Sequence, residues 1–338
     1  MPFSKMPLVF PKETNVPKVP QIQPRTPLPR RHRLVLTVVL GVCAAVICWW
    51  RLHNDGVLAA DFTWPWRGAR ALLAGENPYH VIQRTGPYPF DAPLYYPLPT
   101  LLFVLPLAWL PAPLAGGAFM GLSTALLVYA GTRDGYQRLP ILLSVPFCNA
   151  LFWPQWAPII TAVVLLPHLL PLALAKPSIG VAAFAARPSW RGAVASVVVL
   201  AGSFAVLPTW PLDWFAAVRQ HAAVSPLFSF GGPLLLLAAV RWRSWQARLL
   251  LAMTCAPQLP YDVLPVLLVA RTFRQHLVLA ICGWLGVLVW PYAVVLHRND
   301  WMGWQIVWVY LPALVIVLWP MPKHAAVCVP AVEQQSVV

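Results

Sequence analysis

Long apolar stretches alternate along this chain with short polar links rich in proline or arginine. Seven long stretches contain no Asp, Glu, Lys or Arg: 34–50, 92–132, 139–175, 192–212, 220–240, 275–297 and 301–322. A helix needs about 20 apolar residues to cross a bilayer, and each of the two longest stretches has room for two short spans. The pattern predicts an all-α polytopic bundle with about eight to ten transmembrane spans.

Basic turns between these stretches indicate how the chain is oriented. They lie at residues 133–138, 187–191, 241–248 and 271–276, and positively charged links tend to stay in the cytoplasm. Placing the last three turns there puts residues 209–226, and the turn at Tyr261 and Asp262, on the outer side. This placement requires short, proline-broken helices around residues 155–176 and 249–261, which are tolerated where they line a cavity and do not face lipid.

The composition agrees with a membrane setting. Hydrophobic residues make up 59% of the 338 residues and charged residues only 10%, and the mean hydropathy is +0.66, whereas soluble proteins carry roughly 25% charged residues. The net charge is +14. Because the arginines form short clusters between apolar stretches, and not one continuous face, contact with anionic membrane lipids explains this charge and nucleic-acid binding does not.

The same pattern divides the chain into three parts. Residues 1–33 are rich in Pro, Lys and Arg, which predicts a disordered cytoplasmic tail. Residues 34–322 form the multi-pass domain, beginning with an anchor whose N-terminal side is cytoplasmic. Inside this domain, residues 51–97 are the longest polar link and are predicted to be an outer loop. Residues 323–338 form a short polar C-terminal tail.

Residues 61–75 within the outer loop predict a short helix that lies along the membrane surface. Thr63 can cap its start, and Gly75 can end it. Arg67 and Arg70 share one face of this helix. The apolar positions share another face, namely Phe62, Trp66, Ala69 and Leu73.

The residues best suited to chemistry gather in three segments. One is Asp61 and the helix after it, ending in Gly75-Glu76-Asn77-Pro78-Tyr79. Another is Asp91-Ala-Pro-Leu-Tyr95-Tyr96-Pro97, followed by an apolar stretch that ends Pro106-Leu-Ala-Trp-Leu-Pro111. The third is Lys176-Pro177, which holds the only lysine between Lys18 and Lys323. A lysine isolated in apolar sequence is costly unless it is paired or reaches the interface.

These segments resemble the polytopic GT-C glycosyltransferases of the GT87 type (DUF2029-type), which include polyprenol-phosphate-mannose-dependent mannosyltransferases. The family pattern is an Asp after the first span, a helix ending in Gly-x-Asn/Asp-Pro-Tyr, a Tyr-x-Pro-Pro start to the second span and a Pro-Leu-Ala-x-Leu-Pro exit. Asp61 and residues 75–79, 95–97 and 106–111 match it in order. A Gly-Gln turn and a Lys-Pro pair usually follow, where this chain has Pro154-Gln155 and Lys176-Pro177.

The resemblance implies a GT-C-like inverting enzyme of the bacterial inner (plasma) membrane. It would move a sugar such as mannose from a polyprenyl-phosphate donor to a glycolipid or cell-envelope glycan, without a metal or other cofactor. Asp61 would be the general base, and cations near the leaving phosphate would stabilise its charge. The candidate substrate-binding residues are Arg67, Arg70, Glu76, Asn77, Tyr79, Asp91, Tyr95, Gln155, Lys176 and Asp262.

Several alternatives stay open at this point. Asp55 is a rival base, and Asp61 could simply cap a helix. A transporter or flippase would place ionisable residues along a path through the bundle. A catalytically inactive, lipid-binding relative of the family is a third interpretation. The sequence contains no P-loop, GxGxxG, HExxH or GxSxG pattern, so nucleotide hydrolysis, Rossmann-type and serine-hydrolase chemistry have no support.

Overall fold

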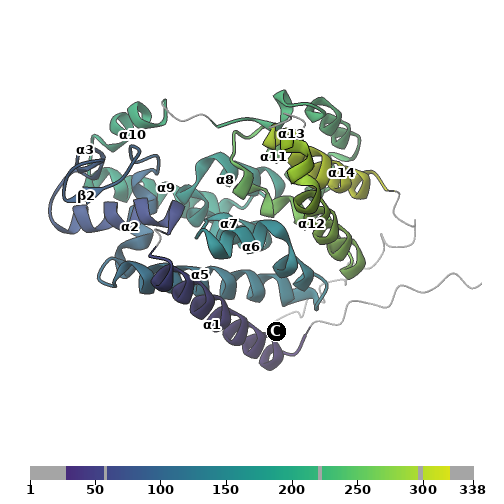
Figure 1. Cartoon of the computed structure of the whole chain (residues 1–338), viewed down its shortest axis with the longest axis horizontal. Helices are drawn as coiled ribbons and strands as arrows, with labels where there is room; N and C mark the ends of the chain where they lie inside the picture. The colour runs from purple at the N-terminus through teal and green to yellow at the C-terminus, as the bar shows by residue number, and fades with distance from the viewer. Residues whose placement is uncertain (1–27, 57–58, 220–222, 296–299, 320–338) are drawn as a thin grey trace, which may run out of the picture. The chain divides into compact units, whose positions relative to one another are not determined.

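Helices make up nearly all the regular structure of this computed structural model, which describes residues 28–56, 59–219, 223–295 and 300–319 (Figure 1). The prediction of an all-α membrane-type chain is therefore confirmed at the level of fold class. The one small sheet pairs β1 (Ile82–Gln83) with β2 (Tyr88–Pro89) in parallel. The first helix starts at Arg30, so the predicted tail boundary at residue 33 is a few residues late. The predicted C-terminal tail, 323–338, lies outside the described residues.

Four helices of the described residues are long and apolar enough to cross a membrane, which fits a multi-pass membrane protein. They are α1 (Arg30–Asn54), α5 (Ala112–Gly131), α12 (Phe273–Val295) and the continuous run of α13 (Trp301–Gln305), η8 (Ile306–Tyr310) and α14 (Leu311–Leu318). A fifth span results if α9 (Trp190–Val206) and α10 (Trp210–Val218), bent by 100° at their junction, count as one.

The prediction of eight to ten spans is too high, because the other apolar stretches are broken into short helices. Their α-helices are α4 (Leu98–Val104), α6 (Val145–Phe152), α7 (Ala157–Leu165), α8 (Pro177–Ala186) and α11 (Trp245–Cys255). Their longer 3₁₀ helices are η4 (Pro167–Ala175), η6 (Gly232–Arg241) and η7 (Pro260–Val269). Proline begins or interrupts most of these elements and removes the N–H that a continuing helix needs.

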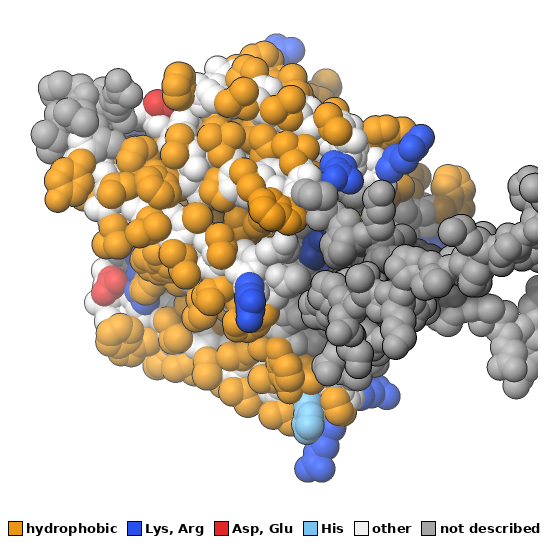
Figure 2. All heavy atoms as spheres, turned by 90° about the vertical axis from the view of Figure 1, so that its right-hand side faces the viewer, with side chains coloured by type: hydrophobic (Ala, Val, Ile, Leu, Met, Phe, Trp, Pro, Cys, Tyr) orange, Lys and Arg blue, Asp and Glu red, His pale blue; other side chains and the backbone are white. Residues whose placement is uncertain are grey.

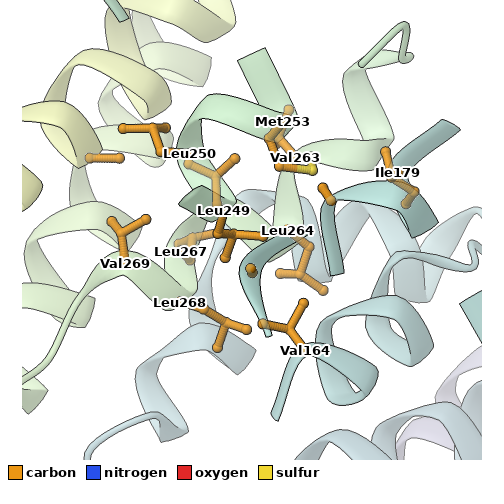
Figure 3. Packing of buried hydrophobic residues seen from close by; sticks show 14 of the residues in the cluster. Val164, Ile179, Leu249, Leu250, Met253, Val263, Leu264, Leu267, Leu268 and Val269 are labelled. Carbon is orange, nitrogen blue, oxygen red and sulfur yellow. The ribbon is translucent and has the colours of Figure 1, made fainter. Parts of the chain in front are cut away.

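The short helices form the interior of the structure. Buried side chains of α7, α8, α11 and η7 pack together in one apolar cluster (Figure 3), which includes Val164, Ile179, Leu249, Met253 and Leu264. Two of the long helices are more exposed: only 17% of the apolar window of α1 and 28% of that of α12 are buried, whereas 67% of the window that contains α5 is buried. The predicted short, proline-broken helices around 155–176 and 249–261 are thus present, but they pack into a core instead of lining a cavity.

The exposed surface of the long helices is largely apolar. Figure 2 shows hydrophobic side chains over much of one face, with Lys and Arg in separate spots. The pair α1 and α5 packs closely through small residues, since a Cβ at Gly117 would lie 2.8 Å from Trp49 Cβ and one at Gly121 would lie 2.7 Å from Ala45 Cβ. Close backbone approach at small residues is typical of helices packed in a membrane.

Charged side chains gather toward two ends of the described structure, and one of these ends holds most of the acids together with Arg67, Arg70 and Arg84. The arginine end is formed by the start of α1 and the four basic turns. Arg33 donates to Tyr129 O at 2.8 Å, and Arg248 donates to Ala186 O at 2.9 Å. The carboxylate end is formed by residues 55–111, α10 and residues 256–262, where Asn77 donates to Asp213 at 3.1 Å. The segments predicted to share the outer side therefore meet at one end.

The helix predicted at 61–75 is α2 (Ala60–Leu73), followed by the short α3 (Pro78–Val81). It starts before Thr63, which is buried inside the helix and does not cap it. Gly75 (φ +77°) ends it as predicted, with Gly75 N–H donating to Leu72 O and Glu76 N–H donating to Ala71 O. The helix was predicted to rest its apolar face on the membrane surface. That face is instead buried by the rest of the protein, since Phe62 is 1% exposed and Trp66 7%.

Candidate functional site

Three of the predicted site residues meet in one buried ion cluster. Lys176 Nζ lies 2.9 Å from Asp61 Oδ2 and 2.7 Å from Asp262 Oδ1. Asp61 and Lys176 are 115 positions apart, and Asp262 comes from a third element. The side chain of Asp262 is 1% exposed, whereas those of Asp61 and Lys176 are each 11% exposed. We call these three residues the triad.

Lys176 is positioned by the junction of η4 and α8. Its carbonyl accepts from Gly180 N–H at 2.9 Å and so closes the first turn of α8, which Pro177 begins. A Cβ at Gly180 would collide with the carbonyl oxygen of Ala173, so only glycine allows this close packing of α8 on η4. The preceding carbonyl, Ala175 O, accepts from the Thr100 hydroxyl at 2.9 Å. The lysine is therefore held on a fixed backbone and does not sit on a mobile loop.

The two carboxylates come from the first turns of other helices. Asp61 lies in the first turn of α2, and Asp262 lies in the first turn of η7, where its Oδ2 accepts from Leu259 N–H at 3.0 Å. A carboxylate is stabilised at a helix N-terminus by the exposed N–H groups and the helix dipole. Both acids thus have a local structural role as well as an ion pair with Lys176.

The triad contains two carboxylates for one ammonium. Burial by itself lowers the pKa of Lys176, but the charges of Asp262 and Asp61 outweigh it and leave that pKa above its ordinary value. Burial raises the pKa of Asp262, and Lys176 opposes this rise. Lys176 is therefore protonated, and the cluster holds one more carboxylate than its lysine can neutralise.

Tyr96 is a further member of the site that the sequence analysis did not select. Burial raises the pKa of its hydroxyl, and the neighbouring Asp61 carboxylate, to which the hydroxyl is hydrogen-bonded, raises it further. Tyr96 is consequently a neutral donor to Asp61. Its backbone carbonyl accepts from the Tyr79 hydroxyl at 2.9 Å. The sequence signal for this residue was the doublet Tyr95-Tyr96. Neighbouring residues of this segment point to different sides, and Tyr96 is the one that points inward.

Gln155 lies in an aromatic layer next to this group. It is 1% exposed, and neither amide atom has a hydrogen-bond partner among the described residues. The next residue, Trp156, has its ring 6.4 Å from that of Tyr96 and 4.8 Å from that of Phe119. Buried amides without partners are rare in proteins, so Gln155 is an exception in this core.

An open pocket of about 440 Å³ lies beside the triad's aromatic neighbours, between α3, the segment 82–93 and α10. Its lining includes two predicted residues, Tyr79 and Asp91. It also includes polar residues that were not selected: His80, Gln83, Arg84 and Asp213. The three triad residues do not line it, so Tyr79 and Tyr96 are the link between the pocket and Asp61.

Asp213 is the organising acid of this pocket. Its Oδ2 accepts from Asn77 Nδ2 at 3.1 Å and from the Thr209 hydroxyl at 3.2 Å, and its Oδ1 lies 3.5 Å from His80 Nε2. Asn77 also caps α3 by accepting from Tyr79 N–H at 3.0 Å. The predicted residue Asn77 thus joins α3 to α10.

The remaining predicted residues surround the site without touching the triad. The Arg67 guanidinium is 5.8 Å from the Phe90 ring centre, and burial lowers the pKa of Arg67. Arg70 is exposed and lies 4.9 Å from the Trp66 ring centre. Glu76 is exposed at the end of α2. The Tyr95 carbonyl accepts from Trp214 Nε1 at 2.9 Å, which fixes α10 against this loop.

The described residues contain no group of three or more His, Cys, Asp and Glu side chains that could hold a metal ion. In the comparisons with known proteins, no family model matches the chain, and no curated protein or solved structure matches it either. The likeness to GT-C glycosyltransferases therefore rests on the sequence motifs described above. The chemistry of the site has to be argued from its own residues.

Proposed function

We propose that this chain is a membrane glycosyltransferase that moves a sugar from a polyprenyl-phosphate donor to a hydroxyl group of a lipid or cell-envelope glycan. The observation that carries the proposal is the triad. Its residues were selected separately, as a base, a phosphate ligand and a substrate-binding acid, and they come from three segments that fold to one point. An open pocket whose lining includes polar groups lies beside the aromatic neighbours of the triad, at the end that we propose faces outward.

The charge balance of the triad suits this reaction. In an inverting displacement the acceptor oxygen bonds to the anomeric carbon while the bond from that carbon to the phosphate oxygen breaks. The acceptor proton passes to Asp61, and the electron pair leaves with polyprenyl phosphate. Asp262 is the acid closer to Lys176 and the more deeply buried, so Lys176 can stay paired with it while Asp61 takes the proton. The Lys176 ammonium is also the cation available to the phosphate.

The ion pair between Asp61 and Lys176 has to open for this reaction. At 11% exposure, neither side chain offers room for a substrate beside it. The donor phosphate can replace Asp61 as a partner of Lys176 and thereby free the carboxylate for the acceptor. We accordingly expect donor binding to precede acceptor activation.

A second candidate function is ion-coupled transport, which the burial of the triad favours. Phe62, next to Asp61, stacks on Phe119 at 4.5 Å. Phe119 is seven residues into α5, which puts this level about 10 Å along the helix axis. Ionisable residues inside a membrane bundle often belong to ion or proton pathways. Proton-driven uptake of a solute into proteoliposomes, lost in Asp61→Asn, is the result that would favour transport.

The test of the proposed function is sugar transfer by the purified protein. Radiolabelled polyprenyl-phosphate mannose and a membrane lipid extract are supplied to the wild type, to Asp61→Asn and to Asp55→Asn. Asp55 is the rival base, with a side chain 53% exposed beside Arg51. We expect transfer by the wild type, transfer by Asp55→Asn, and a loss of about a hundredfold or more in Asp61→Asn. Equal transfer by all three proteins would contradict the assignment of the base.

A further inference from the structure

The lining of the 440 Å³ pocket mixes polar and apolar groups, and an apolar strip lies outside it. Asp91, Arg84 and Gln83 supply exposed polar groups on one wall, and Asp213 lies on the other. Tyr79 and Phe90 add aromatic surface. Carboxylates accept hydrogen bonds from hydroxyl groups, and amides both accept and donate them, so these polar groups match a polyhydroxylated ligand.

The charge of the pocket argues against an anionic group. Asp91 and Asp213 face one guanidinium, Arg84, and His80 is already beside Asp213. Apart from this histidine, the lining holds two carboxyl groups and one guanidinium, an excess of one acidic group. A phosphate headgroup would be repelled by this excess, whereas the hydroxyls of a neutral sugar would be bound by the carboxylates.

The apolar strip continues the membrane-facing surface of α9. Val197 and Val198 are each 64% exposed on α9, and after the 100° bend Leu212 is 74% and Phe215 55% exposed on α10. Positions three apart on a helix share a face, so Leu212 and Phe215 form one outward stripe. The flank of α10 next to this stripe carries Asp213 and Ala217, which line the pocket. The helix thus separates a polar pocket from an apolar surface continuous with that of a candidate span.

We propose that the pocket binds the neutral sugar headgroup of a membrane glycolipid, whose chains run along the outward face of α10 and α9. The identification of this glycolipid as the acceptor rests on the proposed function, but its binding does not. Tyr79 then lies between the bound headgroup and Tyr96, which is hydrogen-bonded to Asp61. These two hydrogen bonds connect the pocket to Asp61, the proposed base.

Ala216 allows a steric test, because its side chain is exposed and lines the pocket. Ala216→Trp fills the pocket, and Ala239→Trp places the same bulk on an exposed position of η6, outside the pocket and the proposed chain-binding face, as a matched control. Equilibrium binding of radiolabelled mannosyl diacylglycerol is measured on the full chain in nanodiscs without donor. Phosphatidic acid serves as the anionic competitor. If Ala216→Trp does not fold, Asp91→Ala, which changes an exposed side chain, replaces it.

We expect saturable binding by the wild type and by Ala239→Trp, at least about tenfold weaker binding by Ala216→Trp, and little competition by phosphatidic acid. Unchanged binding by the pocket variant would overturn the proposal. Phosphatidic acid competing as well as unlabelled glycolipid would also overturn it, since the pocket would then recognise phosphate. Asp61→Asn should bind the glycolipid normally, because Asp61 does not line the pocket. Glycolipid binding without sugar transfer would therefore reject the proposed function and leave this inference intact.

Discussion

The two ends of the described structure use charge in opposite ways. At the carboxylate end, acids pair with groups from distant segments. Asp61 and Asp262 pair with Lys176, and Asp213 accepts from Asn77. At the arginine end, guanidinium groups mostly bind backbone carbonyls. Asp134 is the only acid there among the described residues, and it pairs with Arg138 at 3.0 Å. The described acids of the other end are Asp55, Asp61, Glu76, Asp91, Asp213 and Asp262.

The arginines close the ends of helices. Arg248 donates to Ala185 O and Ala186 O at the end of α8, and Arg187 donates to Leu165 O at the end of α7. Arg241 reaches Leu318 O at the end of α14. The last carbonyls of a helix lack hydrogen-bond partners and carry a partial negative charge. A guanidinium donates the missing hydrogen bonds and its positive charge offsets the negative one. The arginine end is thus explained by structure, whereas the excess carboxylate at the other end is not.

The largest expected effect comes from removing the cation of the triad. Lys176→Met leaves two carboxylates without a counter-ion in a site where Asp262 is 1% exposed. Breaking a buried ion pair costs about 3–5 kcal/mol. We expect Lys176→Met to lower the unfolding temperature in detergent strongly and Lys176→Arg to lower it less. A Lys176→Met protein as stable as the wild type would show that the triad is not formed.

A smaller effect is expected at the arginine end. Arg248→Met removes charge-assisted bonds to the carbonyls that close α8, each worth roughly 1 kcal/mol net. We expect a loss of about 1–3 kcal/mol in unfolding free energy, with sugar transfer per folded molecule unchanged. Arg243 is the matched control, since it is exposed and Arg243→Met should change stability by less than about 0.5 kcal/mol. If Arg248→Met abolished transfer without unfolding the protein, the division of roles between the two ends would be wrong.

The sequence predicted much of the site because charge is rare in this chain. An isolated lysine in apolar sequence has to find a partner, so Lys176 stood out, and Asp61 and Asp262 were among few acids. The proline-broken helices around 155–176 and 249–261 followed from the positions of the basic turns. Partners joined through packing could not be predicted, since Asn77 and Asp213 are 136 positions apart.

The span count and the setting of α2 could not be predicted for a different reason. A charge-free stretch shows that a segment avoids water, but lipid and a protein core satisfy that requirement equally. Residues 139–175 became four short helical elements, η3 (Leu139–Leu143), α6, α7 and η4, most of them in the core. The apolar face of α2 was likewise compatible with a membrane surface and with burial by α4 and α5.

The central claim, that a chemical end and a structural end face opposite sides of the membrane, is tested most directly by thiol labelling. A cysteine is placed at Arg84, in the exposed pocket wall, or at Arg243, in an exposed basic turn, after the six native cysteines have been replaced. A membrane-impermeant maleimide is added to intact cells and to permeabilised cells. The account predicts labelling of Arg84→Cys in intact cells and of Arg243→Cys only after permeabilisation. Labelling of both positions from the same side would contradict it.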